Sequence, residues 1–236
     1  IPVSNKVLYA VGISPLSVSN GYTSRTHGVA TGLETQGMEV IVAPLPGKPW
    51  DKGAQSGFRI PREHRRYLRK VNDVTYSHNP GLRAWEGDFD TFIQVSADAY
   101  VREAMIEKPE YILAASNYLS ALPALIAARR LGVPFVYEMR GFWEVSAASV
   151  NPGWEETDQY HLDRKFELLL AHEADRVVVI TDEMREDLIA RGVPAEKIDV
   201  APNCVDVKKF APLGKDVALL GKLGFTSPEL PVVGFA

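Results

Sequence analysis

Short apolar runs that alternate with segments of helical periodicity most constrain the fold of this chain. Each run is bounded by Gly, Pro, Asn or Ser, so the pattern predicts buried strands of a parallel sheet wrapped by helices. The expected strands are Lys6–Ile13, Met38–Leu45, Asp73–Tyr76, Tyr111–Ala115, Pro134–Met139, Arg176–Ile180 and Lys197–Ala201. The expected helices are Thr23–Gln36, Phe89–Glu107, Tyr118–Leu131, Asp158–Ala174 and Asp182–Arg191. The predicted fold class is therefore α/β, with a Rossmann-like, doubly wound parallel sheet.

The stretch Pro46–Asn72 interrupts this alternation. It is rich in Gly, Pro and positive charge, and Arg59–Lys70 carries six basic residues against the single acidic residue Glu63. We expect an excursion from the sheet here that is partly helical.

The C-terminal segment predicts a change of domain. After Pro212 comes a polar linker with a short helix at Asp216–Leu223, and then the apolar segment Leu230–Ala236. We interpret residues 1–212 as one domain, and residues 213–236 as a linker with the first strand of a second domain that is missing. The alternative is that this last strand docks on the edge of the sheet.

Composition narrows the class of protein. The net charge of −4 argues against nucleic-acid binding, which needs a basic surface to neutralise phosphates. A single cysteine, Cys204, cannot form an internal disulfide and suits a reducing compartment. No apolar run approaches the roughly 20 residues that span a bilayer, and no signal peptide precedes the first strand. We expect a cytoplasmic protein.

The loop after the first strand is a candidate binding site. Gly21 and Tyr22 stand at the start of a helix, where free N–H groups and the positive end of the dipole attract anions. The Gly-x-Gly-x-x-Gly fingerprint of dinucleotide-binding proteins and the P-loop ending are both absent from this loop. Arg25 and His27 follow in the helix as further substrate-binding candidates. The alternative is a simple turn followed by solvated helix residues.

A second candidate site lies at the end of the strand Pro134–Met139. The sequence there places Arg140, Trp143 and Glu144 at the sheet edge where ligands bind. Arg140 could offset negative charge on a leaving group, Trp143 could stack on a sugar, and Glu144 could orient or deprotonate a hydroxyl. The alternative is a buried Arg–Glu pair with a packing Trp. Asn117, just after another expected strand, is a further substrate-binding candidate.

Polar residues also follow the last two expected strands. Thr181 and Glu183 stand between a strand end and a helix start, and Asn203 and Asp206 come after the final strand. Each is a candidate for substrate binding at the ligand edge. The alternatives are local: Thr181 caps the next helix, and Asn203 and Asp206 form turns.

The spacing of several motifs resembles that of family 4 glycosyltransferases. Gly37–Val42 is similar to the family's "G-x-E/H-V" turn into the second strand. Glu173–Thr181 resembles the "E-x-x-A-D-x-V-x-x-x-S/T" strand. Val200–Asp206 and Phe210–Pro212 resemble the "V-x-P-N-G-V-D…F-x-P" approach to the hinge, with Cys204 where Gly is usual. Many relatives have a His near the Arg140 block, and this chain resembles a subset without it.

This resemblance implies the N-terminal, acceptor-side half of a two-domain GT-B enzyme. Such an enzyme transfers a sugar from a nucleotide-diphosphate sugar to a hydroxyl acceptor, generally with retention of configuration and without a metal. The donor-binding half would be missing, so the fragment alone should be inactive. Some members act on lipid-linked acceptors, which implies peripheral contact with the inner membrane face through basic residues. The candidate residues for that contact are Arg62, Arg65, Arg66 and Arg69.

Three alternatives to this interpretation stay open. The basic stretch could be a solvated helix face. The chain could be a stand-alone module that binds an acceptor or a partner without catalysis. It could also belong to a sugar-nucleotide epimerase, which shares the GT-B architecture.

Overall fold

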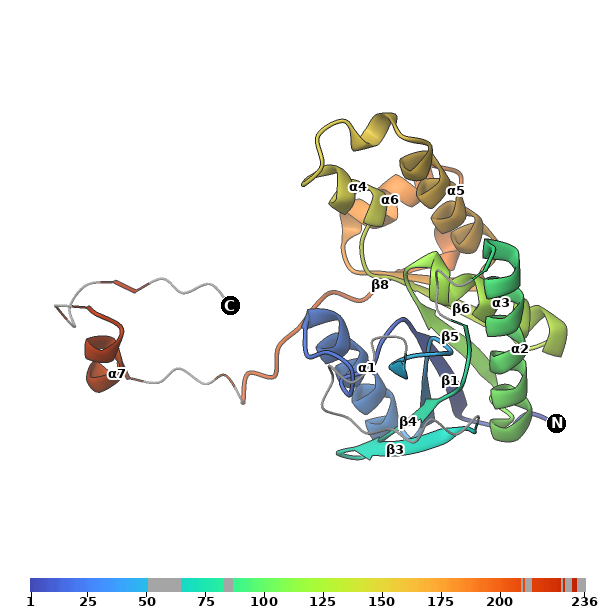
Figure 1. Ribbon diagram of the computed structural model, residues 1–236, viewed down its shortest axis with the longest axis horizontal. Helices are drawn as coiled ribbons and strands as arrows, with labels where there is room; N and C mark the ends of the chain where they lie inside the picture. The colour runs from blue at the N-terminus through green and yellow to red at the C-terminus, as the bar shows by residue number, and fades with distance from the viewer. Residues whose placement is uncertain are drawn as a thin grey trace. The chain divides into compact units, whose positions relative to one another are not determined.

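The computed structural model describes residues 1–50, 65–82, 87–208, 210, 214–225, 227 and 231–232 (Figure 1). The strands are β1 (Lys6–Val11), β2 (Glu39–Pro44), β3 (Tyr67–Val71), β4 (Val74–His78), β5 (Tyr111–Ala115), β6 (Phe135–Met139), β7 (Arg176–Val179) and β8 (Ile198–Val200). The α-helices are α1 (Gly21–Thr35), α2 (Phe89–Glu107), α3 (Tyr118–Leu131), α4 (Trp143–Ala148), α5 (Asp158–Glu173), α6 (Asp182–Ala190) and α7 (Val217–Lys222). The short 3-10 helices η2 (Trp154–Glu156) and η3 (Ala195–Lys197) are also described.

The strands form one sheet in the order β3-β4-β2-β1-β5-β6-β7-β8. Neighbouring strands are parallel except for β3 and β4, which are antiparallel. From β1 the chain first builds outward through β2 and β4, and then returns to the other side of β1 with β5. The predicted doubly wound α/β fold is confirmed, and its switch in strand order lies between β1 and β5.

The strand β3 corrects the prediction for Pro46–Asn72. Residues 67–71 form an antiparallel hairpin with β4, in which Tyr67 pairs with His78 and Val71 pairs with Val74. Asn72 adopts a left-handed conformation with φ of 51°, which suits the tight turn between the two strands. Because β3 is an edge strand with exposed charged side chains, its sequence lacks the apolar signature of the buried strands. Residues 51–64, also predicted as part of the excursion, lie outside the described residues.

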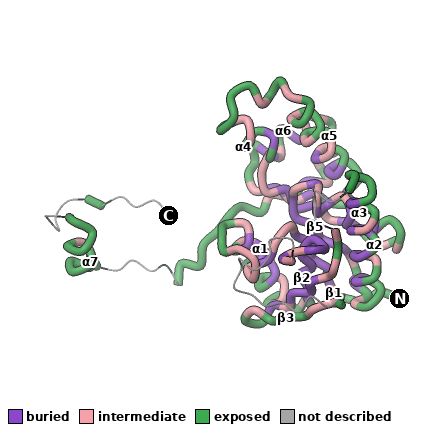
Figure 2. The backbone as a smooth tube through the Cα atoms, in the orientation of Figure 1, coloured by how far each residue is buried: buried purple, intermediate pink, exposed green. Residues whose placement is uncertain are grey.

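Helices cover both faces of the sheet, so β1 is buried along most of its length (Figures 1 and 2). Leu8 and Ala10 of β1 face one core, which contains residues of α2, α3, α5 and α6. Val7, Tyr9 and Val11 point to the opposite core, which α1 covers. This alternation explains why a strand buried on two faces is apolar throughout.

The helix ends agree with the stop signals in the sequence. Asn117 caps the start of α3, and Gly132 ends it in a left-handed conformation with φ of 66°. Left-handed glycine is the usual residue at such a helix end because it lacks a Cβ that would clash. The helix α4, which begins at Trp143, was not expected from the sequence.

The chain divides into two compact units, Ile1–Pro202 and Asn203–Ala236. The sheet and the helices α1 to α6 belong to the first unit, and α7 belongs to the second. The predicted boundary at residue 212 stays a prediction, and most of Leu230–Ala236 lies outside the described residues. In the portions of the chain that the structure describes, every helix is too short or too polar to cross a bilayer.

Candidate functional site

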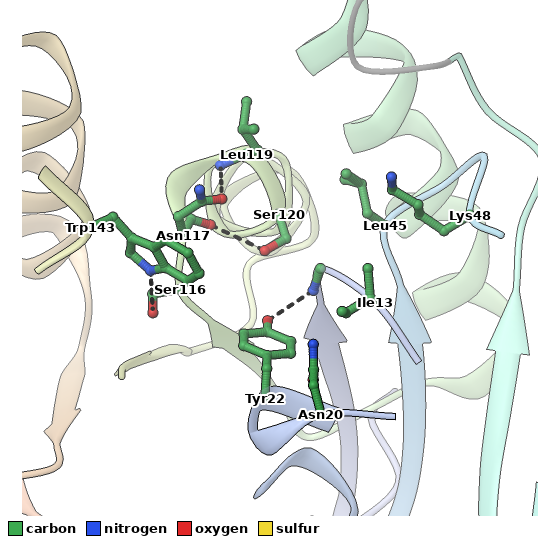
Figure 3. Close-up of a pocket in the computed structure, with 11 residues that line it drawn as sticks. Ile13, Asn20, Tyr22, Leu45, Lys48, Ser116, Asn117, Leu119, Ser120 and Trp143 are labelled. Carbon is green, nitrogen blue, oxygen red and sulfur yellow. Dashed lines mark hydrogen bonds between the residues drawn. The ribbon is translucent and has the colours of Figure 1, made fainter. Parts of the chain in front are cut away.

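A cavity of ≈ 280 Å³ lies at the carboxyl ends of β1, β2 and β5, where the strand order switches (Figure 3). This is the edge at which open α/β sheets bind their ligands. Trp143 lies on one side, and Leu45 and Lys48 lie on the other, with Tyr22 and Asn20 below the start of α3 (Figure 3). The lining residues are Gly12, Ile13, Asn20, Tyr22, Leu45, Lys48, Ser116, Asn117, Leu119, Ser120 and Trp143.

The start of α1 forms one wall of this cavity. Asn20 and Thr23 cap the helix reciprocally, each accepting a hydrogen bond from the other's backbone N–H at 3.0 and 3.1 Å. The Tyr22 hydroxyl accepts a hydrogen bond from the N–H of Gly12 at 3.0 Å. Tyr22, a predicted binding residue, therefore lines the cavity, and the predicted Gly21 stands beside it at the start of the helix.

The start of α3 forms the opposite wall. The Asn117 side chain accepts a hydrogen bond from Leu119 N–H at 3.3 Å, and the Ser120 hydroxyl donates to the Asn117 carbonyl at 3.1 Å. Ser116 accepts hydrogen bonds from the Trp143 indole at 3.2 Å and from the Arg140 backbone N–H at 3.1 Å. These bonds join α3 to the segment that carries Trp143. The predicted binding residues Asn117 and Trp143 thus share one cavity.

Arg140, predicted to be catalytic, lies behind this cavity in a buried network. Its guanidinium donates to Glu138 at 2.9 and 3.1 Å, to the Thr26 hydroxyl at 2.9 Å and to the Tyr9 hydroxyl. The Arg140 side chain is only 6% exposed. Burial by itself raises the pKa of Glu138. The charge of Arg140, its hydrogen bonds and that of Tyr9, and the charge of Arg25 together outweigh burial and hold that pKa below the usual value. The buried Arg–Glu pair weighed as an alternative is therefore present, with Glu138 as the carboxylate.

Glu144, the other predicted catalytic residue, is fully buried at the start of α4. Its Oε1 atom lies 3.4 Å from the guanidinium of Arg191. Its Oε2 atom has no hydrogen-bond partner among the described residues. Neither Glu144 nor Arg140 lines the cavity. Both side chains are buried, and the catalytic roles of Arg140 and Glu144 stay predictions.

Two predicted residues of α1 lie away from this cavity. Arg25 donates to Glu138 at 2.8 Å and to the carbonyl of Ala201 at 3.0 Å. It also lines a second cavity of ≈ 310 Å³ on the face of the sheet that α1 covers. His27 lies 3.1 Å from both the Tyr76 hydroxyl and the Asn72 side chain. Both residues are therefore engaged within the protein.

The remaining predicted binding residues occupy helix starts and the second unit. Thr181 caps α6 by accepting a hydrogen bond from Met184 N–H at 3.2 Å, and Glu183 is exposed in the same first turn. Asn203 and Asp206 belong to the second compact unit. Asp206 accepts a hydrogen bond from Lys208 N–H at 3.0 Å, which fits its turn-forming alternative. Within the first unit, neither Thr181 nor Glu183 is among the residues that line the cavity.

The basic residues proposed for membrane contact are not equivalent. Arg62 lies outside the described residues, and Arg65 and Arg69 are exposed. Arg66 forms ion pairs with Glu103 at 2.8 Å and with Glu107. Because Glu103 is buried, Arg66 neutralises a buried carboxylate and is not presented to a membrane.

Several cavity residues were not predicted from the sequence. Lys48 and Leu45 follow β2, and Ser116 follows β5. The available signal was their position just after buried strands whose carboxyl ends share one edge of the sheet. Among the described residues, no group of three or more His, Cys, Asp or Glu side chains could hold a metal ion.

Comparison with known proteins finds similarity over most of the chain. A family model described as "Glycosyl transferase 4-like domain" matches residues 20–204. The D-inositol 3-phosphate glycosyltransferase of Nocardiopsis dassonvillei is 34% identical over 119 residues, which are 50% of this chain and 27% of that protein. The matched region thus spans about a quarter of the length of this curated relative.

Two solved structures show the fold. Anabaena Alr3699/HepE in complex with UDP-glucose has a TM-score of 0.61 at 15% identity, covering 93% of this chain and 50% of that one. The UDP-N-acetylglucosamine 2-epimerase from Rickettsia bellii has a TM-score of 0.59 at 20% identity, covering 94% and 51%. The predicted Rossmann-like half of a GT-B fold is therefore confirmed.

Proposed function

This chain belongs to the glycosyl transferase 4-like domain family, and we propose that it forms the acceptor-side half of a glycosyltransferase. The enzyme would transfer a sugar, with retention of configuration, from a nucleotide-diphosphate sugar to a hydroxyl group of the acceptor. Half the length of the solved relatives lies outside the matched region. We assign binding of the sugar-nucleotide donor to a second domain that corresponds to the unmatched half of those relatives. We therefore expect the 236 residues alone to be inactive.

The observation that carries this proposal is the mixed lining of the cavity at the switch point. Trp143 offers an aromatic face on which the C–H face of a sugar or cyclitol ring can stack. Asn117 and Ser120 supply amide and hydroxyl groups that can bind ring hydroxyls. Among the described lining residues, Lys48 carries a positive charge, which suits an acceptor with an anionic group. A hydroxyl-rich ring with a phosphate or carboxylate fits this combination.

The matched relative supplies a probe for this acceptor. Its name states inositol 3-phosphate, a polyhydroxylated ring with one phosphate. The first experiment is an NMR titration of the chain with inositol 3-phosphate. We expect the Trp143 indole and the Asn117 amides to shift, and Trp143→Ala and Asn117→Ala to weaken binding. Glu183→Gln, at an exposed site outside the cavity, is the control and should bind like the parent protein.

The titration also separates the proposal from its rivals. Shifts confined to Thr181, Glu183 or the basic β3 strand would refute an acceptor site in this cavity. Sugar transfer by the 236-residue chain would contradict the assignment of the donor site to a second domain. The epimerase alternative rests on fold likeness alone, whereas the family match favours glycosyl transfer.

A lipid-linked acceptor and contact with the inner membrane face remain part of the proposal. Arg65 and Arg69 are the exposed basic side chains of the candidate set that the structure describes. Each basic residue near an anionic membrane surface contributes about 1 kcal/mol to binding. Two such residues give a weak attraction, so other contacts would have to contribute.

A further inference from the structure

A buried carboxyl group anchors the α3 wall of the cavity from behind. Glu167 of α5 is 1% exposed. One of its carboxylate oxygens accepts a hydrogen bond from the backbone N–H of Tyr118 at 2.8 Å, and the other accepts one from the Tyr137 hydroxyl. Since Tyr118 is the first residue of α3, Glu167 holds the first turn of that helix.

The anchored turn is the one that faces the cavity. Asn117, Leu119 and Ser120 lie on either side of Tyr118 in the chain, and all three line the cavity. Trp143, on the neighbouring wall, is bonded through its indole to Ser116, which precedes Asn117. A change in the bond between Glu167 and Tyr118 therefore bears directly on the position of cavity residues.

The hydrogen bonds and the surroundings of Glu167 favour opposite protonation states. Two donors point at its carboxyl group, an arrangement that suits the ionised form. Burial, with the nearby carboxylates of Glu144 and Asp163, favours the neutral form and raises the pKa of Glu167 to about 7. Among the described residues, the groups that act on it are Asp163 on α5, Glu144 on α4, Tyr137 on β6 and the Tyr118 backbone on α3. Glu144 is itself paired with Arg191 of α6, which also pairs with Asp187.

We propose that Glu167 is a positioning residue for the acceptor cavity, and that its protonation loosens the first turn of α3. This rests on the proposed function only in naming the cavity as the acceptor site. A proton on Glu167 must occupy one of the two oxygens that now accept hydrogen bonds. There it either competes with the Tyr118 N–H for that oxygen or obliges the Tyr137 hydroxyl to turn and accept. In the first case α3 loses the anchor of its first turn, and in the second the anchor weakens because a neutral carboxyl is a poorer acceptor.

The experiment is an NMR titration of the 236-residue chain with pH, which needs no ligand. We expect the amides of Asn117, Leu119 and Ser120 and the indole of Trp143 to shift with one common midpoint. In Glu167→Gln that common titration should vanish, because the amide side chain does not ionise. Glu103→Gln removes another buried carboxyl that lies outside the lining, and should leave the midpoint unchanged.

A second variant keeps the proposal testable if Glu167→Gln does not fold. Tyr137→Phe removes one donor to the ionised carboxylate and should move the common midpoint to higher pH. Persistence of the common titration in Glu167→Gln, or no change of midpoint in Tyr137→Phe, would overturn the proposal. So would shifts limited to Tyr118 and Tyr137 with the cavity residues unmoved.

A ligand titration then distinguishes this inference from the proposed function. The probe is myo-inositol, which carries no titratable group of its own, at pH 5.5 and 8.5. In the parent we expect Kd to be several-fold higher at pH 5.5 than at pH 8.5. In Glu167→Gln we expect the same Kd at both pH values. An equal Kd at both pH values in the parent would refute the coupling. No binding at either pH, with the ligand-free titration as expected, would refute the acceptor assignment and leave the coupling in place.

Discussion

Two buried titratable groups should make the free energy of unfolding of this protein depend on pH, and their two contributions have opposite signs. His78 is fully buried, and burial lowers its pKa to about 4. In the unfolded chain its pKa is 6.5, so the folded state resists a proton that the unfolded state accepts. The contribution of His78 is therefore complete above pH 6.5 and is lost as pH falls toward 4.

Glu167 has the reverse linkage. Its pKa is about 7 in the folded protein and 4.5 in the unfolded chain. Its contribution is complete below pH 4.5 and is lost as the pH rises through 7. With a shift of 2.5 pKa units at 1.36 kcal/mol per unit, each group changes the free energy of unfolding by about 3 kcal/mol at most. In the parent protein the two slopes largely cancel between pH 4.5 and 7.

Substituting one of the two groups should make the pH dependence that comes from that group measurable. Glu167→Gln removes a destabilising ionisation, so its free energy of unfolding relative to the parent should increase by about 3 kcal/mol from pH 4.5 to 8. For His78→Gln the same difference should fall by about 2 to 3 kcal/mol over this range. Losses from packing are independent of pH and displace each curve without tilting it.

Urea unfolding followed by circular dichroism, at half-unit pH steps from 4.5 to 8, measures these differences. The difference between variant and parent isolates one group, because all other ionisable groups are common to both. Parallel curves for parent and variant would refute the linkage for the group that was changed. If the stability difference between variant and parent changed with pH in the same direction for both variants, the assignment of a neutral, unprotonated His78 and a neutral, protonated Glu167 to the folded protein would be refuted.

Three further predictions follow from contacts described above. Asn117→Ala removes the N-cap of α3 and should reduce the free energy of unfolding by about 1 kcal/mol, measured in urea, with Asn117→Asp retaining most of it. Arg140→Gln leaves Glu138 buried with less compensation and should destabilise the fold by about 3 to 5 kcal/mol; a loss below 1 kcal/mol by thermal or urea unfolding would contradict the buried pair. Arg65→Glu with Arg69→Glu should weaken sedimentation with anionic vesicles, and unchanged vesicle binding in this double variant would refute the membrane proposal. Arg66→Glu should instead destabilise the protein by repelling Glu103.

The alternation of strands and helices could be predicted because a strand that is buried on both faces of the sheet is a short run of apolar residues. Met38–Leu45 is apolar because its strand lies between two layers of helices, and the structure places β2 within it. The strand β3 has no such apolar run. Its exposed Leu68, Arg69 and Lys70 are compatible with a strand at the edge of a sheet or with a helix surface, and pairing with β4 decides between them.

The site could be predicted only in part, because its residues come from strands that are distant in sequence. Tyr22, Asn117 and Trp143 stand out locally as helix-start or aromatic residues at strand ends. Lys48 becomes a neighbour of Asn117 only when β2 and β5 flank β1. The sequence also could not show that the Arg140 side chain points into the core. The hydroxyl that accepts its hydrogen bond there belongs to Tyr9, which lies 131 residues away in the chain.

The hairpin of β3 and β4 also bears on whether the sheet can extend from one molecule to another. An edge strand presents unpaired backbone groups that can recruit another strand and start aggregation. Here the strand at one edge is positively charged at Arg69 and Lys70, so two copies that approach through it bring like charges together. At the opposite edge β8 has only three residues, and its Asp199 forms an ion pair with Arg176 of the neighbouring strand β7. A repelling edge and a short edge together discourage continuation of the sheet from one molecule to the next.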